Sequence, residues 1–236
     1  MKRRRTLSSK ASSWLFILPA LTVVILLLLY PVTSSIFYSL TNKNLIKPTY
    51  RFLGLDNYIK TLTDPDFWTA FWNDLKWTFF SLLGQLIVGF TGALALNRIK
   101  KGSSIYRTIL IIPWAIPSIV LAFSWKWILN GVYGFLPNLL IKLGLCSTAP
   151  EFLTGNLAFA TLVFINIWFG SPLIMVNILS ALQTVPKDQY EAAQIDGANT
   201  FQSFWHITVP HIRTVVGLLV VLRTIWIFIH AFAFFI

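Results

Sequence analysis

Five long apolar runs, none of which contains an acidic residue, dictate most of what this chain can fold into. They extend approximately over Trp14–Phe37, Trp77–Leu96, Ile105–Leu129, Leu157–Leu182 and Val215–Ile236. A helix needs about 20 mostly apolar residues to cross a bilayer, so each run predicts one transmembrane helix. An outer-membrane barrel would instead show segments of about ten residues with alternating polarity, and these runs do not alternate.

The composition agrees with a membrane protein. Hydrophobic residues make up 56% of the 236 residues and charged residues only 11%, whereas a soluble domain carries about 25% charged residues. The predicted fold class is therefore all-α, a polytopic bundle of transmembrane helices in contact with membrane lipid. The net charge of +11 comes from short basic clusters beside the apolar runs, so nucleic-acid binding is not expected.

The N-terminus combines a basic cluster, MKRRR, with the first apolar run, an order that also occurs in signal peptides. That run continues well beyond 15 residues and no small-residue cleavage site follows it, so we expect a retained first helix. Lys and Arg accumulate in cytoplasmic loops. With the N-terminus inside, the inner segments hold eleven Lys and Arg residues, and the longer outer segments hold seven. This bias predicts a multi-pass protein with a cytoplasmic N-terminus.

The runs divide the chain into three segments. Residues 1–40 hold the basic cluster and the first helix, residues 41–75 form an extracytoplasmic loop, and residues 76–236 form a core with a cytoplasmic loop at 183–213. The chain stops inside the fifth run. A sixth run, which would return the C-terminus to the cytoplasm, is absent, so we expect the core to be C-terminally incomplete.

Several kinds of chemistry are missing from the sequence. All eight acidic residues are expected in loops, whereas carriers coupled to protons or sodium keep an ionisable group near the membrane midplane. No glycine is followed by Lys, so the phosphate-binding pattern G-x-x-x-x-G-K-[ST] is absent, as is H-E-x-x-H. The single Cys146 excludes an internal disulfide and a Cys-cluster metal site. We therefore expect neither an enzyme nor a metal site nor a cofactor in this chain.

Arg223 is the one charged residue deep in a predicted span, about ten residues into the fifth run. At 1.5 Å per residue it lies roughly 15 Å from the inner face. It either pairs within the protein or snorkels to the interface, or it faces a cavity or a partner subunit.

The loop between the fourth and fifth runs shows start and stop signals for two short helices. Pro186 suits the first turn of a helix, and Gly197 can adopt the left-handed conformation that ends it. Asn199 or Thr200 can cap a second short helix, which Pro210 is expected to end before the fifth span.

The first of these helices has a surface with almost no side chains, made by Ala192, Ala193, Gly197 and Ala198. Such a surface lets another protein chain approach the helix backbone closely. An ordinary helix resting on lipid headgroups is the competing interpretation. A lipid-binding helix, however, usually carries Lys and Arg on its polar face, and this segment is acidic.

The same loop resembles that of the permease subunits of binding-protein-dependent ABC importers. Their loop carries Glu-Ala-Ala, three residues, Gly, nine residues, Ile, one residue and Leu-Pro. The matching positions here are Glu191, Ala192, Ala193, Gly197, Ile207 and Pro210, with Val209 in place of Leu. Asp196, in the sequence DGA, is also typical of the family. The segments Tyr106–Leu140 and Ala181–Ala198 are similar to the carbohydrate branch of maltose and glycerol-phosphate type.

This resemblance implies a permease subunit in the inner membrane of a prokaryote. The permease would pass a sugar or related hydroxylated solute and would pair with a second permease subunit. Two ATP-binding subunits would dock through Glu191, Ala192, Ala193, Asp196, Gly197 and Pro210. A solute-binding protein would deliver the solute from outside. ATP would be bound by the partner ATPase, with no cofactor in this chain.

The solute path is less determined by the sequence. Trp114, Asn166, Ser171 and Asn177 are candidates to line it, although Ser and Asn also commonly join transmembrane helices. The alternative functions are an ion-independent secondary transporter or channel without an ATPase, and a membrane scaffold that transports nothing.

Overall fold

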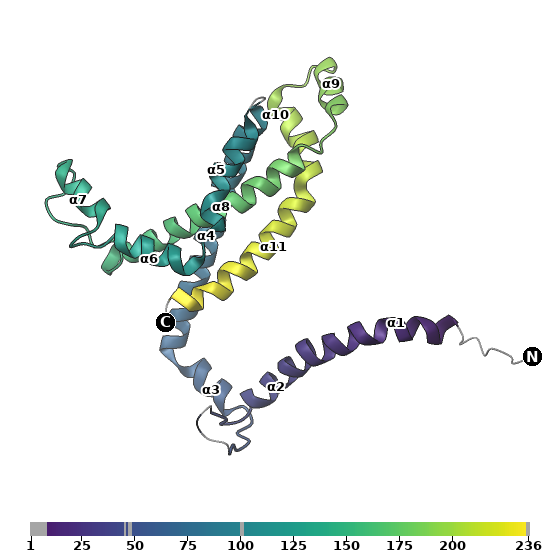
Figure 1. The fold of residues 1–236 in the computed structure, drawn as a ribbon, viewed down its shortest axis with the longest axis vertical. Helices are drawn as coiled ribbons and strands as arrows, with labels where there is room; N and C mark the ends of the chain where they lie inside the picture. Colours follow the sequence, from purple (N-terminus) through teal and green to yellow (C-terminus); the bar gives the residue numbers. More distant parts are fainter. Residues whose placement is uncertain (1–8, 45, 47–48, 100–101, 235–236) are drawn as a thin grey trace, which may run out of the picture. The chain divides into compact units, whose positions relative to one another are not determined.

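The computed structural model describes residues 9–44, 46, 49–99 and 102–234. Apart from one isolated bridge between Thr41 and Phe52, the regular secondary structure of these residues is helical, which confirms the all-α fold class. The chain forms two units, residues 1–70 and residues 71–236 (Figure 1). The N-terminal basic cluster and Lys100 and Lys101, which contribute to the predicted orientation, lie outside the described residues.

The first unit holds the first apolar run. It comprises α1 (Ser9–Val24), a π turn (Ile25–Leu29) and α2 (Tyr30–Ser39), which together supply a 24-residue candidate span. A short helix, α3 (Asp56–Thr63), is fixed to the end of α2. Asn57 Nδ2 donates to the backbone oxygens of Ser39 and Thr41 at 2.9 and 2.8 Å, and Tyr58 shares a 2.7 Å hydrogen bond with Ser39.

The second unit is built around three long helices: α4 (Pro65–Arg98, which begins in the first unit), α8 (Ala158–Leu182) and α11 (Val209–Phe234). Helix α8 packs against α5 (Ser103–Ala115) and α11 (Figure 1). Its Ile174, Ile178 and Leu179 are fully buried, and α8 therefore supplies the centre of the apolar core.

Small residues allow α4 and α8 to approach closely. A β-carbon on Gly89 would lie 2.7 Å from Ile174 Cγ2, and one on Gly92 would lie 2.7 Å from Met175 Sδ. Transmembrane helices commonly use Gly in this way, because in lipid their association depends on packing.

The third apolar run was expected to form one transmembrane helix, and the structure breaks it into two helices. Helix α5 ends at Ala115 and α6 (Ser118–Ile128) starts after a bend of 90°. Ile116 is extended (φ −77°, ψ 133°), as is Pro117 (ψ 133°). A residue before proline avoids the helical region because the pyrrolidine ring clashes with it, and this explains the break. A short helix, α7 (Phe135–Lys142), and a 3₁₀ turn (Gly155–Leu157) then lead to α8.

The fifth apolar run begins earlier than expected, because Pro210 does not break the chain. Helix α10 (Thr200–Ser203), a π turn (Phe204–Thr208) and α11 are continuous. In the π turn the Val209 N–H reaches back to Phe204 O. This wider turn lies where proline would otherwise lose a hydrogen bond and clash with the preceding turn. Pro31, the second residue of α2, follows a π turn in the same way.

The expectation that every acidic residue lies in a loop is also wrong. Helix α4 starts at Pro65 and includes Asp66 and Asp74, and Asp74 is only 7% exposed. Asp74 is the first of four buried polar residues on one face of α4. The others are Thr78, Ser81 and Gln85. The spacing of four, three and four residues keeps these side chains on one side of the helix. Helix α4 therefore carries a buried polar stripe that extends into the second apolar run.

Candidate functional site

The loop at 183–213 begins with α9 (Lys187–Ile195), whose N-cap is Pro186, one position before the predicted first turn. The helix ends in a Schellman motif. Ala198 N–H donates to Ala193 O at 2.8 Å, and Gly197 N–H donates to Gln194 O at 3.1 Å. Gly197 has φ +79°, the left-handed conformation that this motif requires. The predicted role of Gly197 in ending the helix is confirmed.

Asn199, one of the two predicted capping residues, is the N-cap of α10. Its Oδ1 accepts from the Gln202 backbone N–H at 2.9 Å, and Gln202 Oε1 accepts from the Asn199 N–H at 2.8 Å. This capping box satisfies two backbone donors at once. The bend between α9 and α10 is therefore specified by Gly197, Asn199 and Gln202 together.

Helix α9 is joined to the membrane helices through two contacts. The Tyr190 hydroxyl and the Thr208 hydroxyl share a hydrogen bond of 2.7 Å, and Thr208 is 5% exposed. Tyr190 and Ile207 also pack against the core cluster that contains Ile178 and Ile212. These contacts connect α9 with residues of α8 and α11.

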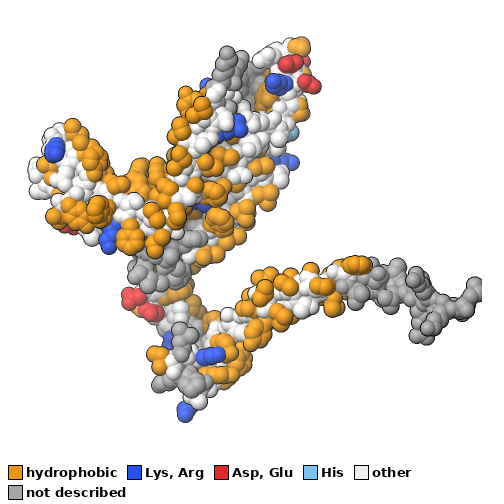
Figure 2. Space-filling view, in the orientation of Figure 1, with side chains coloured by type: hydrophobic (Ala, Val, Ile, Leu, Met, Phe, Trp, Pro, Cys, Tyr) orange, Lys and Arg blue, Asp and Glu red, His pale blue; other side chains and the backbone are white. Residues whose placement is uncertain are grey.

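The predicted coupling residues are mostly at the surface. Glu191, Ala192, Asp196, Gly197 and Pro210 are exposed, and Ala193 is half-buried. Acidic side chains gather at the end of the unit that carries α9 (Figure 2). A shallow hollow of about 350 Å³ separates α9 from the following helix. It is lined by Ala193, Asp196, Gly197, Ala198, Gln202, Ser203, His206 and Ile207.

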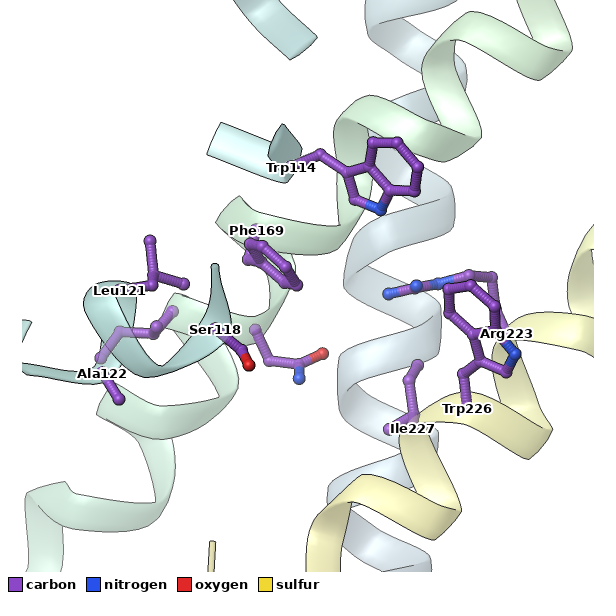
Figure 3. A pocket seen from close by; sticks show the side chains of 10 residues that line it. Trp114, Ser118, Leu121, Ala122, Phe169, Arg223, Trp226 and Ile227 are labelled. Carbon is purple, nitrogen blue, oxygen red and sulfur yellow. The ribbon is translucent and has the colours of Figure 1, made fainter. Parts of the chain in front are cut away.

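A second hollow, the Arg223 cavity, lies among the membrane helices and has a volume of about 400 Å³. Side chains from α5, α6, α8 and α11 converge on it (Figure 3). Its lining residues are Trp114, Ser118, Leu121, Ala122, Ile165, Asn166, Phe169, Arg223, Trp226 and Ile227. Three aromatic side chains and one buried cation therefore line the same cavity, a combination suited to binding a polar solute that has flat apolar faces.

Arg223 is held by a hydrogen-bond network that joins three helices. Its Nε and Nη2 donate to Gln85 Oε1 on α4 at 2.9 and 2.7 Å. Gln85 Nε2 donates to Oδ1 and to the backbone oxygen of Asn166 on α8 at 2.6 and 3.0 Å. Gly170 makes room for the network, since a β-carbon there would collide with the Gln85 amide and the Arg223 guanidinium.

The four predicted path residues are not all in one place. Trp114 and Asn166 line the Arg223 cavity. Ser171 is buried on α8 beside Gly170 and is not among the lining residues. Asn177 Nδ2 donates to Leu173 O within its own helix at 2.8 Å.

Gln85 and Gly170 were not singled out from the sequence. Gln85 is the only amide side chain between Trp77 and Leu96, and it continues the stripe of Thr78 and Ser81. That regular spacing was the available signal.

Sequence comparison gives a family match and several relatives. The family model for binding-protein-dependent transport system inner membrane components matches residues 85–234. The trehalose/maltose transport system permease protein of Thermococcus litoralis is 36% identical over 212 residues, which cover 90% of this chain and 72% of that protein. The sulfoquinovosyl glycerol transport system permease protein of Agrobacterium fabrum is 32% identical over 212 residues, which cover 89% of this chain and 68% of that protein.

Structure comparison gives the same architecture. A chain in the crystal structure of a bacterial ABC transporter involved in the import of the acidic polysaccharide alginate superposes with a TM-score of 0.78 at 24% identity. The match covers 94% of this chain and 74% of that chain. At this level of identity the likeness concerns the fold alone.

Proposed function

This chain belongs to the family of binding-protein-dependent transport system inner membrane components, and we propose that it passes a sugar or related hydroxylated solute across the membrane. It is a permease subunit of an ABC importer, located in the membrane through several apolar helices. The relatives named for trehalose/maltose and for sulfoquinovosyl glycerol support a carbohydrate solute. Family membership favours the importer over an ion-independent secondary transporter or channel.

The observation that carries the coupling mechanism is the attachment of α9. Its acidic, small-residue end is exposed, while Tyr190 ties the other side to Thr208 at the start of α11. An ATP-binding subunit would bind the exposed end of α9 and move the whole helix when it changes conformation. The residues bound would be Glu191, Ala192, Ala193, Asp196 and Gly197. Closure of the ATP-binding subunits would then shift α8 and α11, which line the Arg223 cavity.

The other components would be separate chains. We propose two ATP-binding subunits, a second permease subunit and an extracytoplasmic solute-binding protein as partners. The sequence lacks a phosphate-binding loop, so ATP would be bound by the ATPase partner and this chain would carry out no covalent step. The Lys and Arg bias supports a cytoplasmic position for the N-terminus and the 183–213 loop in a prokaryotic cell.

The Arg223 cavity is the part of the solute path that we propose from this structure. Trp114 and Asn166 contact it directly, and its volume lies within the range of about 300–1,000 Å³ typical of small-molecule sites. Ser171 and Asn177 would contribute to the path in another conformation or from another depth of the bundle.

The test is to purify the importer complex through a tag on this chain and to measure its ATPase activity. Glu191→Arg reverses the charge at the exposed end of α9, and Gly197→Val strains the bend that orients it. Each variant should lower the co-purified ATPase activity at least about tenfold, which corresponds to roughly 1.4 kcal/mol of lost association.

The matched control is Glu151→Arg, which reverses an exposed acid outside the 183–213 loop. It should leave the co-purified activity unchanged. If no ATPase accompanies the wild-type chain, or if Glu191→Arg and Gly197→Val both retain full activity and solute uptake, the importer function is wrong.

A further inference from the structure

We propose that the Arg223 cavity selects a solute that carries an anionic oxygen group, such as the carboxylate of a sugar acid, over a neutral sugar of the same size. This inference rests on the proposed function, because it treats the cavity as part of the solute path. It is carried by the direction of the hydrogen bonds around Arg223.

Arg223 fixes the direction of every bond in the network. A guanidinium group only donates, so the Gln85 atom at 2.7 and 2.9 Å from Nη2 and Nε must be the amide oxygen. The Gln85 nitrogen must then point to Asn166, where it donates both hydrogens, one to Oδ1 and one to the backbone oxygen. Both ends of Gln85 are fully used, and the orientation of Asn166 follows as well.

The network leaves more donors than acceptors available to a solute. Two of the five Arg223 N–H groups go to Gln85, and the other three have no hydrogen-bond partner among the described residues, so they can bind a solute. Asn166 has its Oδ1 occupied, while its Nδ2 makes no hydrogen bond among the described residues. Trp114 adds an indole N–H, which can only donate. Of the described side chains that line the cavity, only the Ser118 hydroxyl and the second lone pair of Asn166 Oδ1 can still accept a hydrogen bond.

The positive charge has no counter-ion in the part of the chain that the structure describes. None of the described residues that line the cavity is acidic. Asp74, the buried acid of α4, lies eleven positions from Gln85, or about three helical turns. A carboxylate accepts hydrogen bonds without donating any, and it neutralises a guanidinium in bidentate geometry. A neutral sugar would instead bring hydroxyl protons that few groups here can accept.

The apolar part of the lining favours a sugar ring over a small inorganic anion. Trp114, Phe169 and Trp226 present aromatic surface around the cavity (Figure 3). The guanidinium lies 5.9 Å from the Trp226 ring centroid, so the charged and aromatic groups are adjacent. A pyranose ring with a carboxylate would use both at once.

The experiment measures binding of digalacturonate and of its neutral dimethyl ester to the complex purified through the tagged chain. Nanodiscs of phosphatidylcholine are used so that no lipid with a net negative headgroup can occupy the cavity. Digalacturonate should bind at least tenfold more tightly than the ester. Arg223→Gln should bring the ratio of the two dissociation constants close to one, and Arg223→Lys should retain part of the preference.

A second variant keeps Arg223 and tests the same idea. Asn166→Asp still accepts from Gln85 Nε2 but places a negative charge beside the guanidinium, so it should also remove the preference. Arg213→Gln, which deletes an exposed cation outside the cavity lining, should keep the wild-type ratio.

Equal binding of acid and ester by the wild type, no binding of digalacturonate, or a preference that survives in both Arg223→Gln and Asn166→Asp would overturn the inference. Failure of the proposed function is distinguishable, since it appears as missing ATPase in the purified complex. That result is independent of the ratio of the two dissociation constants.

Discussion

Arg223 donates through both Nε and Nη2 to one oxygen, Oε1 of Gln85, although 138 positions separate the two residues in the chain. Because Gln85 also donates both of its amide hydrogens to Asn166, the two residues join α4, α8 and α11 at one point. A buried charge that loses its partner is strongly destabilising. The same contact therefore holds the bundle together and presents the remaining Arg223 donors to the cavity.

Gln85→Leu should destabilise the chain substantially. It removes the only hydrogen-bond acceptor that Arg223 contacts among the described residues and leaves a buried cation uncompensated. The expected loss is about 3–5 kcal/mol, or a fall of the thermal midpoint on the order of 10 °C. Gln85→Glu should lose less, since its carboxylate still accepts from Arg223. Circular dichroism melting in detergent measures both, and a midpoint for Gln85→Leu within 2 °C of wild type would contradict the prediction.

Gly170→Ala should disturb the same network without changing a polar group. The added β-carbon would collide with the Gln85 amide and the Arg223 guanidinium, and overpacking of this kind costs about 1–3 kcal/mol. Gly217→Ala is the matched control on α11, because nothing lies within 4 Å of a β-carbon there. That change should be neutral or should raise stability by up to about 1 kcal/mol. If both variants shift the melting midpoint alike, close packing at Gly170 is not the cause.

Gly197→Ala should loosen the end of α9. Apart from its two chain neighbours, no described residue has an atom within 4 Å of the new β-carbon, so the effect comes from the backbone, where φ is +79°. The left-handed conformation costs an L-residue about 1–2 kcal/mol. Hydrogen exchange at the Gly197 and Ala198 amides should therefore accelerate on the order of tenfold. Gly197→Asn should lie between the two, since Asn tolerates this conformation, and equal rates in all three proteins would refute the assignment.

Part of this architecture could be predicted because it depends on local properties of the chain. The apolar runs were long enough to require helices in a bilayer, and Gly197 and Asn199 act on their own backbone. The break at Pro117 depends equally on local backbone geometry, yet the run of apolar residues around it concealed the end of α5.

The Arg223 network could not be predicted in the same way. Its meaning depends on which helices lie side by side, and Gln85, Asn166 and Arg223 come from three of them. Pro210 was predicted from local sequence to break the helix, and this prediction failed for a structural reason. The π turn before Pro210 accommodates the proline, so the helix continues. Contacts between distant residues, and not local propensity, decide the site.

The hydrogen bond between Tyr190 and Thr208 should carry much of the mechanical link between α9 and α11. Tyr190→Phe leaves the buried Thr208 hydroxyl without its partner, which costs about 1–3 kcal/mol. Thr208→Val removes the other hydroxyl, and the double variant leaves no unsatisfied group. The two single changes should therefore be non-additive, with a coupling energy of about 0.5–3 kcal/mol in melting experiments. ATP-driven uptake should fall in Tyr190→Phe while the ATPase subunits still co-purify, because docking at Glu191 is intact. Strictly additive melting effects, or uptake and ATPase association lost together, would show that this contact does not transmit the movement.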